Sequence, residues 1–262
     1  MHPKHASIQV FETKTGLGSA AAASAGAILR AAIAARGAAR IIVGTGPSQN
    51  ETIAALAAEP DVDWSRVEVF HMDEYVGMAD SHPASFRRWL REHLADLVHP
   101  GAVHYMRGDA PDPEAECLRY GALLRASPID ITFIGFGENG HIAFNDPGVA
   151  DFADPAAVKR VTLDRRCRLQ QVGEGHFPDL ESSPAEAITV TCPVLVSAAH
   201  LVCSVPDRRK AEAVRDALEG PLSPACPASL VMTHPDCEIF LDTQSASLLQ
   251  RRPPCPTPNP PR

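Results

Sequence analysis

Residues 40–56 read RIIVGTGPSQNETIAAL, and this stretch decides the class of fold. The four residues RIIV, 40–43, have the apolar composition of a short buried strand. The segment GTGPSQNE, 44–51, has the glycine and proline content of a turn, and it opens a helix that carries the apolar Ile53 and Leu56. A strand, a glycine turn and a helix in this order are typical of a parallel α/β unit.

The same alternation continues along the chain. Further short strands are predicted at residues 67–71, 129–135, 187–191, 201–204 and 238–241. Helices are predicted at residues 19–36, 83–97, 113–125 and 207–218. Gly37 is expected to end the first helix, and Asp207 is expected to cap the last. Alternating strands and helices predict an α/β fold with a mainly parallel sheet covered on both faces, in which ligands bind beyond the carboxyl ends of strands.

The chain of 262 residues, 45% hydrophobic and 21% charged, is long enough for one large core. We expect a single α/β catalytic domain over residues 1–250. The end of the chain, 251–262, is rich in proline and is expected to be disordered. Two segments punctuated by glycine and proline, 148–155 and 170–184, are expected to be surface excursions that could act as lids.

Charge and cysteine content exclude several classes of function. The formal net charge of -8 argues against a nucleic-acid groove, which needs clustered cations. Seven cysteines without a C-x-x-C pair suggest neither a disulfide framework nor a zinc cluster. No stretch approaches 18 uninterrupted apolar residues, and no secretory leader is recognisable at the N-terminus. We therefore expect a cytoplasmic protein with no nucleic-acid or membrane partner.

Three loops after predicted strands could carry chemistry. The turn 44–48 offers backbone N–H groups and two hydroxyls to an anion, although an ordinary βα turn has the same composition. The segment HMDEYVG, 71–77, holds two adjacent carboxylates, of which one could point inward as a base while the other stays solvated; an acidic surface turn is the alternative. The segment 135–147 surrounds His141 with glycines that allow close approach of a ligand.

The remaining histidines show no HExxH or HxH spacing, so no metal site is predicted.

Two blocks, FHMDEYVGMADSHPASF (70–86) and IGFGENGHIAFNDP (134–147), resemble the signature blocks of the glucosamine-6-phosphate deaminase (isomerase) family. The resemblance extends over about residues 39–241 and implies a three-layer α/β/α sandwich with a Rossmann-like sheet. It implies conversion of glucosamine 6-phosphate and water to fructose 6-phosphate and ammonia, without a cofactor. The implied partner is a small aminosugar phosphate. A homo-oligomer is compatible with the sequence, and the number of subunits stays open.

The resemblance also implies roles for individual residues. Asp73 would move a proton from C2 to C1 of the sugar, and His141 would assist ring opening. Asp146 would orient His141, and Asn139 belongs to the same catalytic group. The residues that match the phosphate and substrate contacts are Thr45, Gly46, Ser48, Gly137 and Lys210.

Three positions depart from the family pattern. Asn139 replaces an aspartate before the Gly-His pair, and Gln171 lies roughly where an arginine that binds phosphate is expected. A serine pair that accompanies allosteric activation is absent from 148–150, so no activation of that kind is expected. Two alternatives remain beside the deaminase: a sugar-phosphate lactonase on the same fold, and a sugar-phosphate sensor without catalysis.

Overall fold

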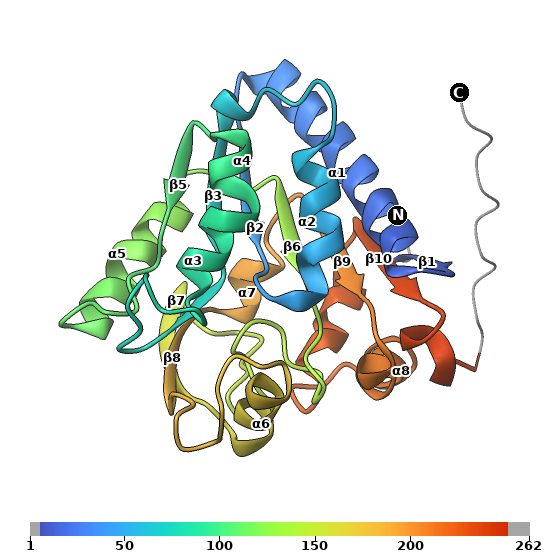
Figure 1. Cartoon of the computed structure of the whole chain (residues 1–262). Coiled ribbons are helices and arrows are strands. Elements are labelled where there is room, and N and C mark those ends of the chain that lie inside the picture. The colour runs from blue at the N-terminus through green and yellow to red at the C-terminus, as the bar shows by residue number, and fades with distance from the viewer. Residues whose placement is uncertain (1–5, 251–262) are drawn as a thin grey trace.

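The computed structural model describes residues 6–250, and a seven-stranded parallel sheet forms its centre (Figure 1). The order of strands is β1-β10-β9-β6-β2-β3-β5. Their bounds are β1 Ser7–Phe11, β2 Ala39–Val43, β3 Val67–His71, β5 Ala102–His104, β6 Ile131–Ile134, β9 His200–Val205 and β10 Cys237–Asp242. The mainly parallel sheet is therefore confirmed. The tail predicted at 251–262 lies outside the described residues.

The sheet changes direction of growth between β2 and β6. From β2 the chain adds β3 and β5 on one side, and it then returns to add β6, β9 and β10 on the other. β2 and β6 are direct neighbours, with Ile41 opposite Ile131. Such a switch point leaves a crevice at the carboxyl ends of the two strands, because their loops leave in opposite directions.

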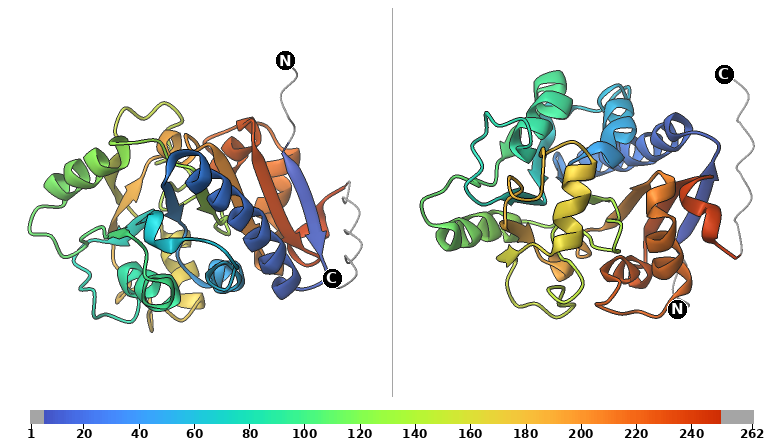
Figure 2. Two further views of the ribbon diagram at one scale, coloured as in Figure 1. Left: turned by 90° about the horizontal axis from the view of Figure 1, so that it is seen from above. Right: turned by 60° about the horizontal axis from the view of Figure 1, so that its bottom comes forward.

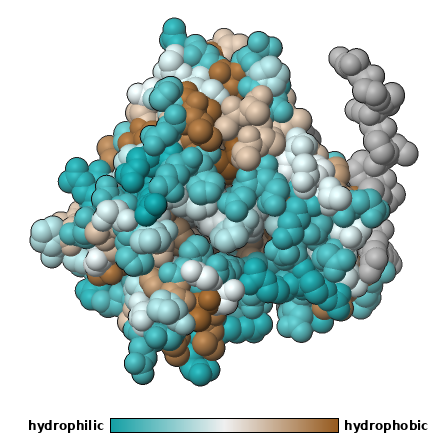
Figure 3. All heavy atoms as spheres, viewed as in Figure 1, coloured by the Kyte–Doolittle hydropathy of each residue, from teal (hydrophilic) through white to brown (hydrophobic). Residues whose placement is uncertain are grey.

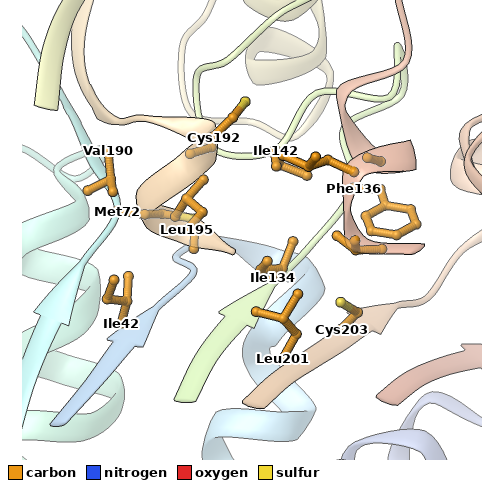
Figure 4. Packing of buried hydrophobic residues seen from close by; sticks show 14 of the residues in the cluster. Ile42, Met72, Ile134, Phe136, Ile142, Val190, Cys192, Leu195, Leu201 and Cys203 are labelled. Carbon is orange, nitrogen blue, oxygen red and sulfur yellow. The ribbon is translucent and has the colours of Figure 1, made fainter. Parts of the chain in front are cut away.

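Helices cover both faces of this sheet, as the left view of Figure 2 shows for α1 on the near side. The main helices are α1 Lys14–Arg36, α2 Asn50–Ala57, α5 Pro113–Arg125, α6 Arg165–Gly173, α7 Cys192–Leu195 and α8 Ala211–Glu219. Successive strand residues face opposite layers: Ile41 packs with the cluster under α1 and α2, whereas Ile42 packs with the cluster that contains α5, α7 and α8. Figure 4 shows the second cluster, where Ile134 and Leu201 face Leu195. The three-layer arrangement is confirmed.

Helix α1 begins five residues before its predicted start, because the Thr13 hydroxyl accepts a hydrogen bond from the backbone N–H of Gly16 at 3.0 Å. It ends at Gly37, whose φ of 79° is the left-handed conformation expected there. A Cβ atom at Gly18 would lie 2.6 Å from the backbone of Glu51, so glycine allows α1 and α2 to pack closely. By length and composition alone α1 could cross a membrane, but Leu17 and its buried neighbours pack in the core.

A second, antiparallel sheet of three strands lies on the side of the large sheet where the carboxyl ends of its strands are found (Figure 1). It contains β4 Asp73–Tyr75, β8 Glu186–Val190 and β7 Val158–Thr162. The strand predicted at 187–191 exists, but it belongs to this small sheet. Four strands, β1, β4, β5 and β7, were not predicted, since they are short or carry polar residues at half of their positions.

Two predicted helices differ in detail from the structure. The segment predicted at 83–97 begins at Phe86, after the capping residue Ser85, and contains α3 Phe86–Leu90, the π-helical turn η3 Arg91–Ala95 and α4 Asp96–Val98. The prediction that Asp207 caps the last helix is wrong. Its backbone has a φ of 86°, and its carboxylate instead pairs with Lys14 at 2.7 Å.

Short 3₁₀ turns connect several of these elements. They are η1 Pro47–Gln49, η2 Trp64–Arg66, η4 Arg208–Lys210, η5 Pro227–Thr233 and η6 Ser245–Leu248. The face shown in Figure 3 is mostly hydrophilic, with hydrophobic residues in scattered patches. Most buried apolar residues pack on the two faces of the large sheet, and a third, smaller cluster that includes Tyr75 and Phe144 packs beside the small sheet.

Candidate active site

A pocket lies at the switch point, beyond the carboxyl ends of β2 and β6. The pocket opens to solvent, and loops that follow β2, β3 and β6 contribute to its wall. Seven predicted site residues line it: Thr45, Gly46, Ser48, Asp73, Gly137, His141 and Lys210. Asp146 and Asn139 do not line the pocket and lie behind His141.

Asp73 is a buried carboxylate with few hydrogen-bond donors. It begins β4 directly after the end of β3, and its side chain is 6% exposed. The Thr45 hydroxyl lies 3.5 Å from its Oδ1, which is a weak contact. Burial, and then the neighbouring Glu74 charge, raise the pKa of Asp73 well above its usual value. A carboxylate in this state is ready to accept a proton.

Glu74 has the opposite environment, and the prediction that one of the two carboxylates stays solvated is wrong. Glu74 is fully buried and lies at the N-terminus of α3. It accepts hydrogen bonds from the Ser85 hydroxyl at 2.8 Å and from the backbone N–H groups of Phe86 and Arg87 at 3.3 and 3.0 Å. Glu74 therefore holds the loop to α3, and Asp73 is the carboxylate of the pair that lines the pocket.

The neighbouring His71 supports Asp73 through the backbone. Its Nδ1 lies 2.9 Å from the carbonyl oxygen of Asp73, and its Nε2 accepts from the backbone N–H of Met106 at 2.8 Å. Burial lowers the pKa of His71 to about 3, so this imidazole stays neutral. Both ring nitrogens are occupied, which assigns His71 a structural role.

His141 is held from behind by Asp146. The Nδ1 atom of His141 lies 2.9 Å from Oδ1 of Asp146, and Asp146 is fully buried. Burial opposes ionisation of Asp146, but the contacts with His141 and Asn139 outweigh it and lower the pKa of this carboxyl. A carboxylate on one ring nitrogen orients the imidazole and leaves Nε2 for a ligand.

Asn139 fits between two carboxylates. Its amide nitrogen lies 2.9 Å from Oδ1 of Asp146 and 3.3 Å from Oδ2 of Asp164, and its carbonyl oxygen accepts from the backbone N–H of His141 at 3.1 Å. Asp164 itself caps α6. An aspartate at position 139 would add a third negative charge here, which explains why this chain carries the amide.

A possible metal-ligand group is formed by His141, Asp146 and Cys167, whose ligand atoms lie within 4.8 Å of one another. The sequence prediction of no metal site did not foresee it. Burial raises the pKa of the Cys167 thiol, which disfavours the thiolate that binds metals. The 2.9 Å contact between Nδ1 of His141 and Oδ1 of Asp146 already pairs two of these three side chains. We interpret the group as support for the imidazole.

Gly137 provides space for the His141 imidazole. A Cβ atom at this position would overlap three ring atoms of His141. The Gly137 backbone N–H also donates to the carbonyl oxygen of His141 at 2.8 Å. The close approach predicted for this glycine is thus made to the histidine ring as well as to the pocket.

We expect Gly137→Ala to lower kcat about 100-fold, because the added methyl group displaces His141 from its position. The measurements are kcat from steady-state kinetics and the midpoint temperature of thermal unfolding. Gly173→Ala is the matched control, since a Cβ atom there meets nothing within 4 Å. Wild-type turnover by the Gly137 variant would contradict this account of the glycine.

The residues after His141 form a strained turn. Ala143 has a φ of 49°, a conformation that L-residues rarely adopt. Asn145 holds the turn by donating from its amide to the carbonyl oxygens of Ile142 at 3.0 Å and Val190 at 2.9 Å. Through the hydrogen bonds of Asn145, the AFN sequence at 143–145 fixes the His141 loop to β8.

The other end of the pocket has the features of an anion site. Thr45, Gly46 and Ser48 approach it from the turn after β2, and Gly46 has a φ of 115° that favours glycine. Lys210 reaches it from η4 and is 3% exposed. Gln171 is a buried residue of the pocket wall, and its Oε1 accepts a hydrogen bond from the Tyr75 hydroxyl at 2.7 Å.

Sequence reasoning did not single out several residues of the pocket wall, among them Gln170, Glu174 and His176. They lie in the segment 170–184, which was predicted as a loop segment that could act as a lid. Its first part is the end of α6. The glycine and proline content of the segment concealed a helix that faces the pocket.

The sequence matches a known protein family. The family model described as glucosamine-6-phosphate isomerases/6-phosphogluconolactonase matches residues 12–239. A glucosamine-6-phosphate deaminase of Exiguobacterium sibiricum is 39% identical over 188 residues, which are 72% of this chain and 73% of that protein. One of Listeria monocytogenes is 34% identical over 202 residues, 77% of this chain and 84% of that protein.

Solved structures agree with this result. A monomeric glucosamine-6-phosphate deaminase has a TM-score of 0.84 at 28% identity, covering 92% of this chain and 99% of its own. A 6-phosphogluconolactonase from Trypanosoma brucei has a TM-score of 0.75 at 18% identity, covering 92% and 98%. The second likeness shows the shared fold alone.

Proposed function

The chain belongs to the family of glucosamine-6-phosphate isomerases and 6-phosphogluconolactonases, and from this premise we propose that it is a cytoplasmic enzyme that deaminates an aminosugar phosphate. The products are a ketose phosphate and ammonia. One observation carries the proposal: Asp73 from β4 and His141 from the loop after β6 line the same pocket as the turn 44–48.

The first task of the site is to open the sugar ring. His141 lines the pocket, and its other side is held by Asp146. We assign to its free nitrogen the transfer of the proton between the ring oxygen and the anomeric hydroxyl. This step exposes the C1 aldehyde, which makes the proton on C2 acidic.

The second task is proton transfer. Asp73 takes the proton from C2 and returns it to C1, while the C1 oxygen gains a proton and the amine nitrogen loses one. The aldehyde thereby becomes an alcohol and the C2 amine becomes an imine. Water then adds to C2 and releases ammonia. The few hydrogen bonds to Asp73 keep its carboxylate basic enough for this role, and a single residue serves both steps because C1 and C2 are adjacent.

A lactonase fits the pocket less well. Hydrolysis of a sugar-phosphate lactone has no carbon-bound proton to move, and Asp73 would then be a buried charge without use. The relatives named above that exceed 30% identity are deaminases, whereas the lactonase structure shares only the fold.

The proposal is tested by incubating the purified protein with glucosamine 6-phosphate, galactosamine 6-phosphate and glucosamine. We expect ammonia and ketose phosphate in equal amounts from at least one phosphorylated sugar. Hydrolysis of 6-phosphogluconolactone is measured in parallel. Lactone hydrolysis without ammonia would favour the lactonase, and binding of the sugars without turnover would favour a sensor.

A further inference from the structure

The anion end of the pocket contains a carboxylate as well as a cation. Glu174, near the end of α6, lines the pocket with Lys210. Its Oε1 lies 3.8 Å from the Lys210 ammonium and 3.8 Å from the guanidinium of Arg209. The Glu174 side chain is 9% exposed and that of Lys210 is 4% exposed, so water screens this pair little.

Neighbouring residues hold Glu174 in this position. The amide of Gln170, one helical turn earlier, donates to Oε1 of Glu174 at 3.0 Å. The side-chain oxygen Oε1 of Gln170 accepts a hydrogen bond from the backbone N–H of Glu138 at 2.9 Å, which ties α6 to the His141 loop. The carboxylate is therefore placed by the fold at the anion end.

No other cation in the described pocket wall offsets Glu174. His176 lies 3.7 Å from it, but burial lowers the pKa of this imidazole, which favours its neutral form. Arg209 is shared with Glu138, whose Oε1 lies 3.4 Å from it. Lys210 and Glu174 thus leave the anion end close to neutral, although a phosphate carries nearly two negative charges.

We propose that Glu174 is a specificity-determining residue that weakens binding of the phosphate end of the substrate, because a phosphate must displace its carboxylate from Lys210. The inference rests on the proposed function for the identity of the substrate. The general chemistry is competition of two anions for one buried ammonium group. Because Gln171 lies roughly where an arginine is expected, Lys210 is the main cation that this pocket wall offers to a phosphate.

The test compares the full-length wild type with Glu174→Gln. Inorganic phosphate binding is measured by calorimetry, and KM is measured for glucosamine 6-phosphate and for glucosamine. We expect the variant to bind phosphate at least about tenfold more tightly and to lower KM for the phosphorylated sugar by a similar factor. KM for glucosamine should stay within about twofold, because that sugar has no phosphate to repel.

Glu138→Gln is the matched control. It removes one negative charge beside Arg209, but Glu138 does not line this pocket. Its phosphate affinity should change much less. Glu174→Ala is the second variant, since it also removes the charge but cannot keep the hydrogen bond to Gln170.

The outcomes separate this inference from the proposed function. Unchanged phosphate affinity in both Glu174 variants would overturn the inference, as would an equal fall of KM for glucosamine. If neither wild type nor variant releases ammonia from glucosamine 6-phosphate, the proposed function fails, and calorimetry with phosphate still decides the role of Glu174. Tighter phosphate binding in both variants, with the control unchanged, supports it.

Discussion

Asp73→Asn is expected to lower kcat for ammonia release about 10⁴-fold, because the amide cannot accept the proton from C2. Asparagine has nearly the same shape, so the pocket and the binding of phosphate should persist. The acid limb of the wild-type kcat/KM profile should lie above the usual range of an aspartate, since the raised pKa of Asp73 keeps it protonated to higher pH.

The same substitution is expected to stabilise the fold by about 2 kcal/mol near neutral pH. A carboxyl whose pKa is raised on folding costs stability once the pH exceeds its unfolded pKa, because the unfolded chain ionises more easily. The advantage of the variant should therefore be absent near pH 3 and should grow as the pH rises toward the folded pKa.

Denaturant unfolding at several pH values, with ammonia release, checks both effects. Asp80→Asn is the control, because the Asp80 side chain is 57% exposed and should leave turnover and stability nearly unchanged. Retained deaminase activity in the Asp73 variant would remove the base from the mechanism. A loss of stability near neutral pH would show that Asp73 has partners which the structure does not reveal.

His141→Gln is expected to lower kcat about 1000-fold, because glutamine can donate or accept a hydrogen bond at this place but cannot shuttle a proton near neutral pH. The fold should persist, since the amide can still contact Asp146 behind the ring. Phosphate binding should stay within about twofold of the wild type, since the anion end is unaltered.

His200→Gln is a matched control for this prediction. Nδ1 of His200 also faces a carboxylate, at 3.2 Å from Asp236. His200 is, however, the first residue of β9, so it lies at the amino ends of the parallel strands, away from the pocket. Turnover of this variant should equal that of the wild type. Equal losses in the two variants would mean that general instability, and not the pocket imidazole, explains the effect.

The positions of the predicted site residues follow from the order of strands. Thr45, Asp73 and His141 each lie in a loop or strand after a predicted buried strand, and parallel strands bring their carboxyl ends to one edge. That rule predicted a shared edge. The family resemblance assigned the chemistry, and the comparisons agree with it.

The errors share one cause. Glu74 and Asp207 were interpreted from their neighbours in sequence, yet their partners are Ser85 and Lys14, which the fold brings to them. The helical start of the polar segment 170–184 was not foreseen for the same reason. The local sequence predicts helices, strands and turns from hydrophobic periodicity and turn residues. It does not predict which distant side chain will form a hydrogen bond or ion pair with a polar group.

The sequence by itself determined the layers of this protein, because alternating strands and helices with apolar strand residues can bury themselves only in a parallel sheet covered on both faces. It also determined where along the chain the reactive groups stand. Only the tertiary structure decided which of the two adjacent carboxylates lines the pocket, why Gly137 must lack a side chain, and that Glu174 faces Lys210. These depend on contacts between loops distant in sequence, whose geometry is set by packing of the whole sheet and not by any local pattern.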